Sequence, residues 1–309
     1  MKTIDITSVG SATIDLFMIG GKFTEKKDRL SLAIGGKYQS EDFTESIGGG
    51  GLNTAVGFSR LGLKTSFAGE LSNDWLGSRI ISKLKDEKVL TQYALQTNIK
   101  PSVSTILLGA TGERTIISYI APNFKTLLNS LVRKSIRLST WLFFCDHKSS
   151  KNYKTEVLRY AVRNKTRIAV SLGKDEFRKG YLHNEEYLKL SDAFFLNAHE
   201  LGDLTKRKYE DLDLIKTNYA EILKTKLLIV TDSRNGEYVY LKGKIVHRKA
   251  YPLNKQSIDT TGAGDAFAVG FLGSCIKERS LEESMDFGSK NAVSVILSLG
   301  AQTGLLYAR

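Results

Sequence analysis

Short runs of consecutive apolar residues recur along the chain, separated by longer segments whose apolar residues fall at helical spacing. Uninterrupted apolar runs are typical of strands in a parallel sheet covered on both faces, and the wider spacing is typical of amphipathic helices. The predicted strands are residues 4–10, 64–69, 141–145, 168–172, 193–196 and 227–231. The predicted helices include residues 76–88, 126–138, 212–223 and a last helix through 285–299. This alternation predicts an α/β fold with a mainly parallel central sheet.

Two segments, residues 16–47 and 98–123, break the alternation because they combine glycines with short alternating apolar pieces. Such pieces predict hairpin strands outside the main sheet, and we expect the two segments to pack together as a small β-sheet lid. No internal repeat or long linker divides the rest, so residues 1–309 are predicted to form a single domain that carries this lid. Lid edges can pair between subunits, which makes them the expected surface of a homodimer.

The composition is that of an ordinary globular protein, with 41% hydrophobic and 25% charged residues. No apolar run approaches the ~20 residues that a membrane span requires, so no membrane association is expected. The N-terminal stretch lacks the pattern of a signal peptide. Cys145 and Cys275 both lie in apolar segments, which predicts reduced core thiols. We therefore expect a cytoplasmic protein.

The formal net charge of +12 would suit a polyanionic partner. The lysines and arginines are nevertheless spread over many predicted helices, without a dense tract or interleaved aromatic residues. Because nucleic-acid binding usually needs a clustered basic face, we expect solvated helix surfaces and no nucleic-acid partner. A phosphate-bearing substrate is a second contributor to such a charge.

The stretch from Asp259 to Asp265 reads DTTGAGD and opens an apolar helix. Gly262 and Gly264 have no Cβ, which permits a tight turn and the close approach of a ligand. The first N–H groups of a helix have no internal partner, so this start suits a phosphate or the charge that develops in phosphoryl transfer. Asp265 adds a carboxylate, which suits a base that takes a proton from an attacking hydroxyl. The alternative is an acidic residue that only stabilises the helix dipole.

Four consecutive glycines, residues 48–51, precede a second apolar helix. Glycine costs backbone entropy, so the run predicts close approach of a ligand or another backbone, although a flexible linker has the same composition. It is not a Walker loop, because no Gly-Lys-Ser/Thr follows, and Asn53 takes the place of the third glycine of a dinucleotide fingerprint. Asn53 could cap the helix or bind a ligand, because its amide both donates and accepts.

Further polar candidates follow predicted strands. Asp15 comes five residues after Gly10, beyond the carboxyl end of the first strand, where an open parallel sheet binds ligands. It could equally be a turn residue. Asn197 and Glu200 follow another strand and are three residues apart, so they face the same way on a helix start. They could orient a hydrated magnesium ion, or they could form an N-cap with an acid in the first turn.

In their order along the chain, these motifs resemble those of the ribokinase-like (PfkB) carbohydrate kinases. Two more segments look like the nucleotide-side loop and the final turn of that family, residues 228–236 and Gly300-Ala301-Gln302. The resemblance covers residues 4–305, essentially the whole chain. It implies a three-layer α/β/α body with a β lid, which transfers the γ-phosphate of ATP to a hydroxyl of a small molecule.

The resemblance also implies a role for each matching residue. Asp265 would be the base, and the backbone amides of Gly262, Ala263 and Gly264 would form the anion hole. The substrate would be held by Asp15, Gly49, Gly50 and Asn53, and Mg2+ with phosphate would be organised by Asn197 and Glu200. The nucleotide would lie along Thr231, Ser233 and Gly236, with Asn291 near the adenine and Asp259 near a monovalent-cation (K+) site.

Departures from the family pattern bear on the ligands. Gly50 stands where ribokinase and the sugar-phosphate kinases of the family carry a lysine, which would help to hold an anionic substrate. We therefore expect an uncharged sugar. Ser233 stands where the family usually has glycine, which would alter how the backbone meets the nucleotide.

Two other functions stay open at this point. A nucleoside kinase of the adenosine type would use the same machinery, with stacking from the lid residues Phe17, Phe23 and Tyr38. A kinase fold retained as a regulatory or nucleic-acid-binding scaffold would make use of the basic charge. The intact DTTGAGD stretch argues against the scaffold, because a scaffold does not need the base Asp265.

Overall fold

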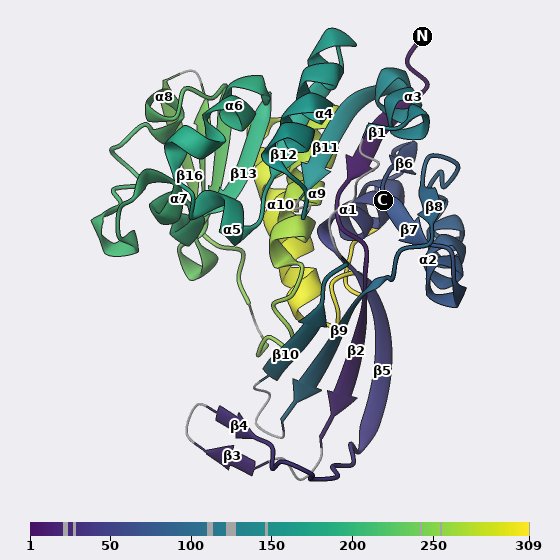
Figure 1. Cartoon of the computed structure of the whole chain (residues 1–309). Coiled ribbons are helices and arrows are strands. Elements are labelled where there is room, and N and C mark those ends of the chain that lie inside the picture. Colours follow the sequence, from purple (N-terminus) through teal and green to yellow (C-terminus); the bar gives the residue numbers. More distant parts are fainter. Residues whose placement is uncertain are drawn as a thin grey trace.

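The computed structural model describes residues 1–20, 24–26, 29–109, 114–121, 128–145, 148–241, 243–253 and 255–308. Within these residues the chain forms a large sheet, a small sheet and two short strand pairs (Figure 1). The large sheet has eight described strands in the order β16-β15-β14-β13-β12-β11-β1-β6. The strands from β6 to β14 are parallel, whereas β15 and β16 are antiparallel additions at one edge. Their bounds are β1 (Ile4–Val9), β6 (Thr65–Phe67), β11 (Ser139–Cys145), β12 (Arg167–Ser171), β13 (Ala193–Asn197), β14 (Leu227–Thr231), β15 (Glu237–Leu241) and β16 (Lys244–Arg248).

The central strands alternate their side chains between two apolar cores. Leu142 and Phe144 of β11 belong to one buried cluster, and Phe143 between them belongs to the other. On β13, Phe194 and Phe195 divide in the same way. Because both faces are buried, the strands read as continuous apolar runs, which is why the sequence pattern located them.

Helices cover both faces of the large sheet, and together they form the body of the molecule (Figure 1). On one face lie α1 (Gly50–Arg60), α9 (Ala263–Ile276) and α10 (Leu281–Ile296). On the other lie α3 (Ser130–Leu138), α4 (Lys151–Arg163), α5 (Lys174–Phe177), α6 (Tyr181–Leu190), α7 (Ala198–Thr205) and α8 (Tyr219–Ile222). At the side, α2 (Trp75–Asp86) packs beside β7 (Glu70–Ser72), which pairs with β8 (Leu95–Thr97). The predicted three-layer α/β/α class is confirmed.

The small sheet projects from one end of the body (Figure 1). Its strand order is β10-β9-β2-β5, with bounds β2 (Thr13–Ile19), β5 (Asp42–Gly48), β9 (Ser102–Leu108) and β10 (Arg114–Tyr119). A further pair, β3 (Thr24–Lys26) and β4 (Arg29–Ser31), lies beyond its outer end. The strands come from both segments that interrupt the alternation, but β2 begins earlier than expected. Asp15 therefore lies within a strand of the small sheet and not in the loop after β1.

The helix predicted over residues 212–223 is wrong, because the described structure has only the short α8 in that segment. The Asp213 carboxylate accepts hydrogen bonds from the backbone N–H groups of Ile215 (3.3 Å) and Lys216 (3.0 Å). The Asn218 side chain then accepts from the N–H of Glu221 at the start of α8. Asp and Asn side chains that bond to nearby backbone N–H groups favour turns and caps over helix interiors, and here they interrupt the pattern.

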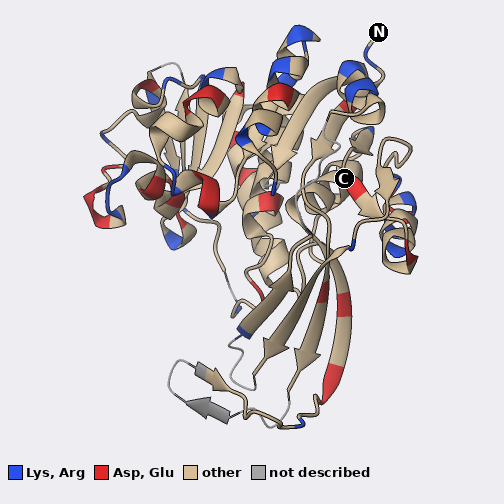
Figure 2. Ribbon diagram, in the orientation of Figure 1, with Lys and Arg blue, Asp and Glu red and all other residues tan. Residues whose placement is uncertain are grey.

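The basic residues are dispersed over the helices of the body and do not gather on one element (Figure 2). Several are paired with acids, for example Arg159 with Glu186 and Lys226 with Asp192. Such a distribution is that of solvated helix surfaces, as the sequence pattern indicated.

Neither of the two cysteines forms a disulfide; Cys145 is buried and Cys275 is partly buried. This confirms the prediction of core thiols without a disulfide. Among the described residues, no helix is long and apolar enough to cross a membrane.

Candidate active site

A cavity of about 290 Å³ opens at the carboxyl ends of three neighbouring parallel strands. Its walls include the last residues of β12, β13 and β14, which are Ser171, Asn197 and Thr231. Ligands of open parallel sheets bind at this end of the strands. The cavity brings together these residues predicted for the site: Gly50, Asn197, Glu200, Thr231, Gly262, Gly264 and Asp265.

The start of α9 forms one wall of the cavity. Gly262 precedes the helix with a left-handed φ of 78°, and no side chain caps the helix start in the described chain. A Cβ on Gly262 would meet the Ala301 Cβ at 2.4 Å, so both the conformation and the packing require glycine. A Cβ on Gly264 would meet no other atom within 4 Å, because this position faces open space. Ala263 begins the helix between them, so the first backbone amides adjoin a place that a ligand can fill.

Asp265 lies in the first turn of α9 and is tied to α1. The side-chain Nδ2 of Asn53 donates a hydrogen bond to Asp265 Oδ2 at 2.9 Å. Asn53 is 4% exposed, so its amide is held inside the protein and not in solvent. The predicted base and the predicted substrate-binding amide, far apart in sequence, are therefore direct neighbours.

The glycine run serves two purposes at adjacent positions. A Cβ on Gly49 would lie 2.6 Å from the Ser11 carbonyl oxygen, and one on Gly51 would lie 2.7 Å from the Gly10 carbonyl carbon. These two glycines permit α1 to begin against the backbone between β1 and β2. Gly50 instead lines the cavity, and a Cβ there would lie 3.7 Å from Asp265 Oδ1. The glycine run therefore permits close backbone packing at Gly49 and Gly51 and leaves access for a ligand at Gly50.

Asp15 occupies the base of the small sheet, beside Gly48. A Cβ on Gly48 would approach Asp15 Oδ2 to 2.4 Å, which accounts for the first glycine of the run. Burial raises the pKa of Asp15 from its ordinary value of 3.8 to about 6, while hydrogen bonds from Ser104 and Thr13 oppose the rise. The negative charge of Asp259 adds to the rise. A partly desolvated carboxylate of this kind gains from ligand hydroxyls that donate to it.

Asp259 is surrounded by donors and is 3% exposed. Its Oδ1 accepts from Arg114 Nη1 at 2.7 Å and from the Thr261 N–H at 2.9 Å, and its Oδ2 accepts from the Gly300 N–H at 3.1 Å. Arg114 is the first residue of β10, so the contact joins the small sheet to the body. This arrangement does not fit a monovalent cation on the Asp259 carboxylate, because a guanidinium already lies against it.

Asn197 and Glu200 form a reciprocal capping box at the start of α7. Asn197 Oδ1 accepts from the Glu200 N–H at 2.9 Å, and Glu200 Oε2 accepts from the Asn197 N–H at 2.8 Å. The capping interpretation therefore holds, and both residues also line the cavity. Among the described residues, no group of three or more His, Cys, Asp or Glu side chains could hold a metal. One carboxylate with an amide fits a magnesium ion that keeps its waters and binds substrate phosphates.

Of the three residues predicted along the nucleotide, Thr231 lines the cavity and the other two shape the turn after β14. Ser233 has a left-handed φ of 47°, so the serine keeps a conformation that glycine adopts more easily. Gly236 has a φ of 97°, and a Cβ there would lie 2.0 Å from the Arg248 carbonyl oxygen. This glycine is required by the neighbouring backbone at residues 248–250.

Asn291 does not reach the cavity, which corrects its predicted place near adenine. The side chain is fully buried on α10. Its Nδ2 donates to the Ala266 carbonyl at 2.7 Å, and its Oδ1 accepts from the Leu306 N–H at 2.9 Å. Both ends of the amide are therefore used to join α10 to α9 and to the C-terminal segment.

Several cavity residues carried no sequence signal. Ser11 contributes its Oγ, which accepts from the Gly50 N–H at 3.2 Å. Phe195 and Phe267 supply apolar wall. Apolar strand and helix residues look alike whether they fill a core or line a cavity, so only the fold distinguishes them.

A family model described as pfkB family carbohydrate kinase matches residues 3–307. The chain belongs to the pfkB family of carbohydrate kinases. A ribokinase of Staphylococcus aureus (strain COL) is 24% identical over 311 residues, which cover 98% of this chain and 97% of the relative. A fructokinase of Escherichia coli is 27% identical over 276 residues, which cover 84% of this chain and 88% of the relative.

Among solved structures, the ribokinase of Arabidopsis thaliana complexed with ribose and ATP superimposes with a TM-score of 0.84. The identity is 22%, and the match covers 99% of this chain and 96% of the other. This likeness confirms the fold of a pfkB kinase.

Membership in the pfkB family confirms the prediction of an ATP-dependent carbohydrate kinase. The comparisons do not separate a sugar kinase from a nucleoside kinase within this group. The scaffold alternative is set aside, because a whole-chain family match comes together with a cavity lined by Gly262, Gly264 and Asp265 of the DTTGAGD motif.

Proposed function

We propose that this kinase transfers the γ-phosphate of ATP to a hydroxyl of a small neutral sugar, with Asp265 as the general base. One observation supports the proposal most directly: Asp265 and Gly264 line the same cavity, and Gly264, at the start of α9, faces open space. A hydroxyl that loses its proton to Asp265 there would face a phosphoryl group held by the amides of Gly262, Ala263 and Gly264. Phosphoryl transfer depends mostly on such positioning and charge stabilisation.

Substrate binding is assigned to Asp15, Gly49, Gly50 and Asn53. The Asp15 carboxylate accepts hydrogen bonds from the sugar hydroxyls, the Asn53 amide holds the substrate beside Asp265, and the glycines leave room for the sugar. The support is the contact of Asn53 with Asp265 and the absence of a side chain at Gly50 on the cavity wall. In this arrangement the sugar lies between the small sheet and α9.

The nucleotide phosphates are assigned to the part of the cavity bounded by Thr231, Asn197 and Glu200. Glu200 and Asn197 would hold Mg2+ through its water ligands, and the ion would neutralise phosphate charge when bound. The turn with Ser233 and Gly236 would lie along the nucleotide. Asn291 has no part in this proposal, because its amide is used inside the protein.

The substrate class follows from Gly50. A phosphorylated acceptor would bring a dianion into a partly buried site, and no side chain at position 50 can pair with it. A neutral acceptor avoids this cost. Lid lysines are the other source of a cation, and Lys37 is exposed in the described structure, whereas Lys22 and the side chain of Lys26 lie outside the described parts.

The nucleoside alternative requires an aromatic face for the base. Phe17 is 2% exposed beside Ile106 of the next strand, and the hydroxyl of Tyr38 accepts from the Ala33 N–H at 2.7 Å. Phe23 lies outside the described residues. Of the aromatic residues named for this role, Phe17 is therefore buried within the small sheet and the Tyr38 hydroxyl is bonded within its extension, which supports a sugar.

The small sheet is proposed to act as a lid that closes over the sugar and excludes water. Its support is the separate sheet topology and the contact of Arg114 with the start of the DTTGAGD motif. A homodimer through this sheet is proposed from β10, where Ile116 is 48% exposed and Ile117 is 58% exposed. An apolar edge strand of this kind is stabilised by pairing with another sheet.

A substrate panel tests the proposal. ADP release is measured with fructose, ribose, fructose 6-phosphate and adenosine under identical conditions. We expect kcat/KM for a neutral sugar to exceed that for fructose 6-phosphate by about tenfold or more. Preference for fructose 6-phosphate would contradict the substrate class, and preference for adenosine would establish the nucleoside alternative.

Gly50→Lys sharpens the test, with Gly50→Ala as the matched control. A Cβ at this position would lie 3.1 Å from the Cys145 Cβ, so both variants require a similar small adjustment. Only Gly50→Lys adds a cation. We expect Gly50→Lys to improve the ratio of fructose 6-phosphate to fructose turnover by about tenfold relative to Gly50→Ala. An unchanged ratio would show that charge at position 50 does not select the substrate.

A further inference from the structure

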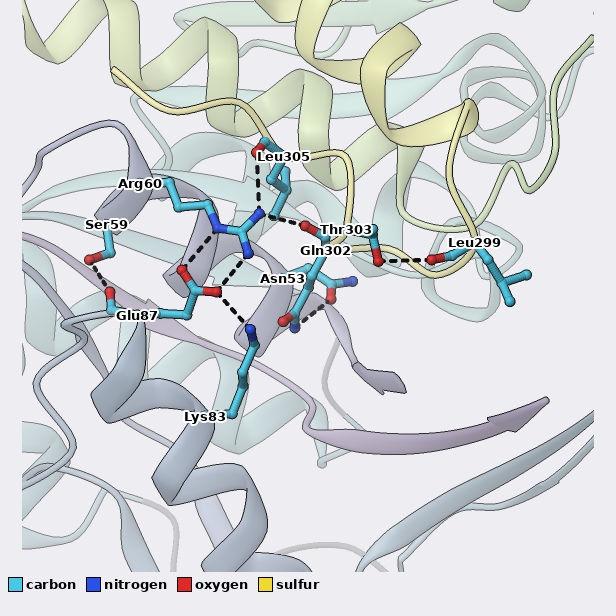
Figure 3. Close-up of polar contacts among 9 residues, drawn as sticks. All are labelled: Asn53, Ser59, Arg60, Lys83, Glu87, Leu299, Gln302, Thr303 and Leu305. Carbon is cyan, nitrogen blue, oxygen red and sulfur yellow. Dashed lines mark hydrogen bonds and ion pairs between the residues drawn. The ribbon is translucent and has the colours of Figure 1, made fainter. Parts of the chain in front are cut away.

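The turn near the C-terminus reaches the predicted base through two hydrogen bonds, the first of which, between Gln302 and Asn53, is drawn in Figure 3. Gln302 is 5% exposed, and its Nε2 donates to Asn53 Oδ1 at 3.2 Å. The other end of the same amide, Asn53 Nδ2, donates to Asp265 Oδ2 at 2.9 Å. Three side chains from the C-terminal turn, α1 and α9 therefore form one hydrogen-bonded chain that ends at the carboxylate.

The direction of this chain depends on the orientation of the Asn53 amide. An asparagine amide has an acceptor oxygen and a donor nitrogen at nearly equal positions, so a rotation of its last bond exchanges them. A carboxylate at Asp265 accepts from the nitrogen and is repelled by the oxygen. Gln302 donates to the oxygen, and so it stabilises the orientation in which the nitrogen faces Asp265.

The turn that carries Gln302 is itself fixed by a buried ion pair (Figure 3). Arg60 Nη1 donates to the carbonyl of Gln302 at 2.7 Å and to that of Leu305 at 3.2 Å. The guanidinium also pairs with Glu87 through Nε at 2.9 Å and Nη2 at 2.6 Å, and Glu87 accepts from Lys83 at 2.7 Å. The side chains of Arg60 and Glu87 are 8% and 9% exposed. A two-pronged Arg–carboxylate pair has a fixed geometry, so it holds the turn against α1 and α2.

We propose that Gln302 is a positioning residue for phosphoryl transfer: it fixes the Asn53 amide, which in turn orients the Asp265 carboxylate and the bound substrate hydroxyl. This role rests on the proposed function of Asp265 as the base. Among the described residues, Gln302 is not part of the cavity lining, and its side chain is linked to the reaction by its hydrogen bond to Asn53. Without it, Asn53 can rotate and place its oxygen toward Asp265, and small displacements at a reacting centre cost rate.

The test is a double-mutant cycle with Gln302→Met, Asn53→Ala and the two together. We expect Gln302→Met to lower kcat/KM for the sugar by about tenfold with an unchanged KM for ATP. In the Asn53→Ala background the same change should have no further effect, because coupled residues are not additive. The matched control is Thr303→Val, since the Thr303 hydroxyl donates to the Leu299 carbonyl within the same turn and is exposed. That control should keep the wild-type kinetics.

Gln302→Glu is a second variant of nearly the same shape as glutamine. Its ionised carboxylate cannot donate to Asn53 Oδ1, so we expect a loss at least as large as that of Gln302→Met. Equal fractional losses in the wild-type and Asn53→Ala backgrounds would overturn the positioning role. A wild-type rate for both Gln302 variants would also overturn it, while an inactive Asp265→Asn measured alongside would leave the base assignment standing. An active Asp265→Asn would instead remove the proposed function on which the inference rests.

Discussion

The large and small sheets of this kinase are stabilised in different ways. Helices cover both faces of the large sheet, and most residues of its central strands are buried. The small sheet has an edge strand, β10, whose side chains are exposed along its whole length. It also has polar contacts with the body, among them Arg114 with Asp259 and Arg79 with Glu45. The body therefore provides a rigid cavity wall, whereas the position of the small sheet depends on a few separable contacts.

The largest effect on turnover is expected in the body, at the proposed general base, Asp265. Asp265→Asn keeps the shape of the side chain and its contact with Asn53, but it removes the group that accepts the proton. We expect kcat to fall by about 100-fold or more, with ATP binding and thermal unfolding close to those of the wild type. Steady-state kinetics and nucleotide titration check this, and a variant with near wild-type kcat would remove Asp265 from the role of base.

A smaller effect is expected where the small sheet meets the motif. Arg114→Ala leaves the buried Asp259 carboxylate without its guanidinium partner, so we expect turnover to fall by about tenfold. Because the guanidinium lies where the family pattern places a monovalent cation, the wild-type rate should be equal in potassium and in tetramethylammonium salts. Arg114→Ala should then become activated by potassium.

The control for Arg114 is Arg79→Ala. It breaks another ion pair between the body and the small sheet, Arg79 with Glu45, but Arg79 is 61% exposed and does not touch the DTTGAGD motif. Exposed pairs contribute little, so we expect turnover within about twofold of the wild type. Potassium activation of the wild-type enzyme would show that Arg114 does not replace the cation.

Asp15, near the start of β2 in the small sheet, should lower the free energy of unfolding while it strengthens sugar binding. Burial raises its pKa to about 6, so the folded state favours the protonated form. Below about pH 4 Asp15 is protonated in both the folded and the unfolded state, so its burial does not lower the free energy of unfolding. The free energy of unfolding falls as the pH rises to about 6, and above that pH the ionised carboxylate destabilises the fold. This difference in pKa corresponds to at most about 3 kcal/mol.

Asp15→Asn removes this cost, and we expect it to increase the free energy of unfolding at pH 7.5 by about 1–3 kcal/mol, with no gain at pH 4. Sugar affinity should fall in the same variant. Urea unfolding at the two pH values measures the first effect. If Asp15→Asn lowered the free energy of unfolding equally at both pH values, the charge of Asp15 would not be what destabilises the fold.

The smallest effect on turnover is expected at the exposed edge strand. Ile117→Lys places a charge on β10, which should disrupt a dimer formed through this strand while kcat changes by less than about twofold. Val162→Lys is the control, because Val162 of α4 is similarly exposed, at 48% against 58%, but lies on the body. Sedimentation of the wild type and both variants measures their oligomeric state, and a monomeric wild type would contradict the proposed interface.

Sequence patterns located the body well because its strands are short and apolar on both faces. The run Trp141 to Cys145 identified β11, and the glycine-rich start of α9 was evident from its own residues. The failure at residues 212–223 came from Asp213 and Asn218, whose side chains bond to backbone N–H groups that a helix would have used.

Contacts between distant segments could not be predicted in this way. Arg114 and Asp259 are 145 residues apart, and Asn53 and Gln302 are 249 residues apart. The family resemblance placed Asp259 near a monovalent-cation site, but nothing local in the sequence indicates that Arg114 of the small sheet pairs with its carboxylate. Helical spacing likewise placed Asn291 on the right helix without showing that its amide would be used inside the protein.

The most direct measurement is phosphorus NMR of the products formed from ATP and a neutral sugar by the purified protein with magnesium. Transfer to a hydroxyl predicts a sugar phosphomonoester signal that grows in step with ADP and disappears in Asp265→Asn. ADP accompanied only by inorganic phosphate, or a phosphomonoester formed undiminished by Asp265→Asn, would contradict the account.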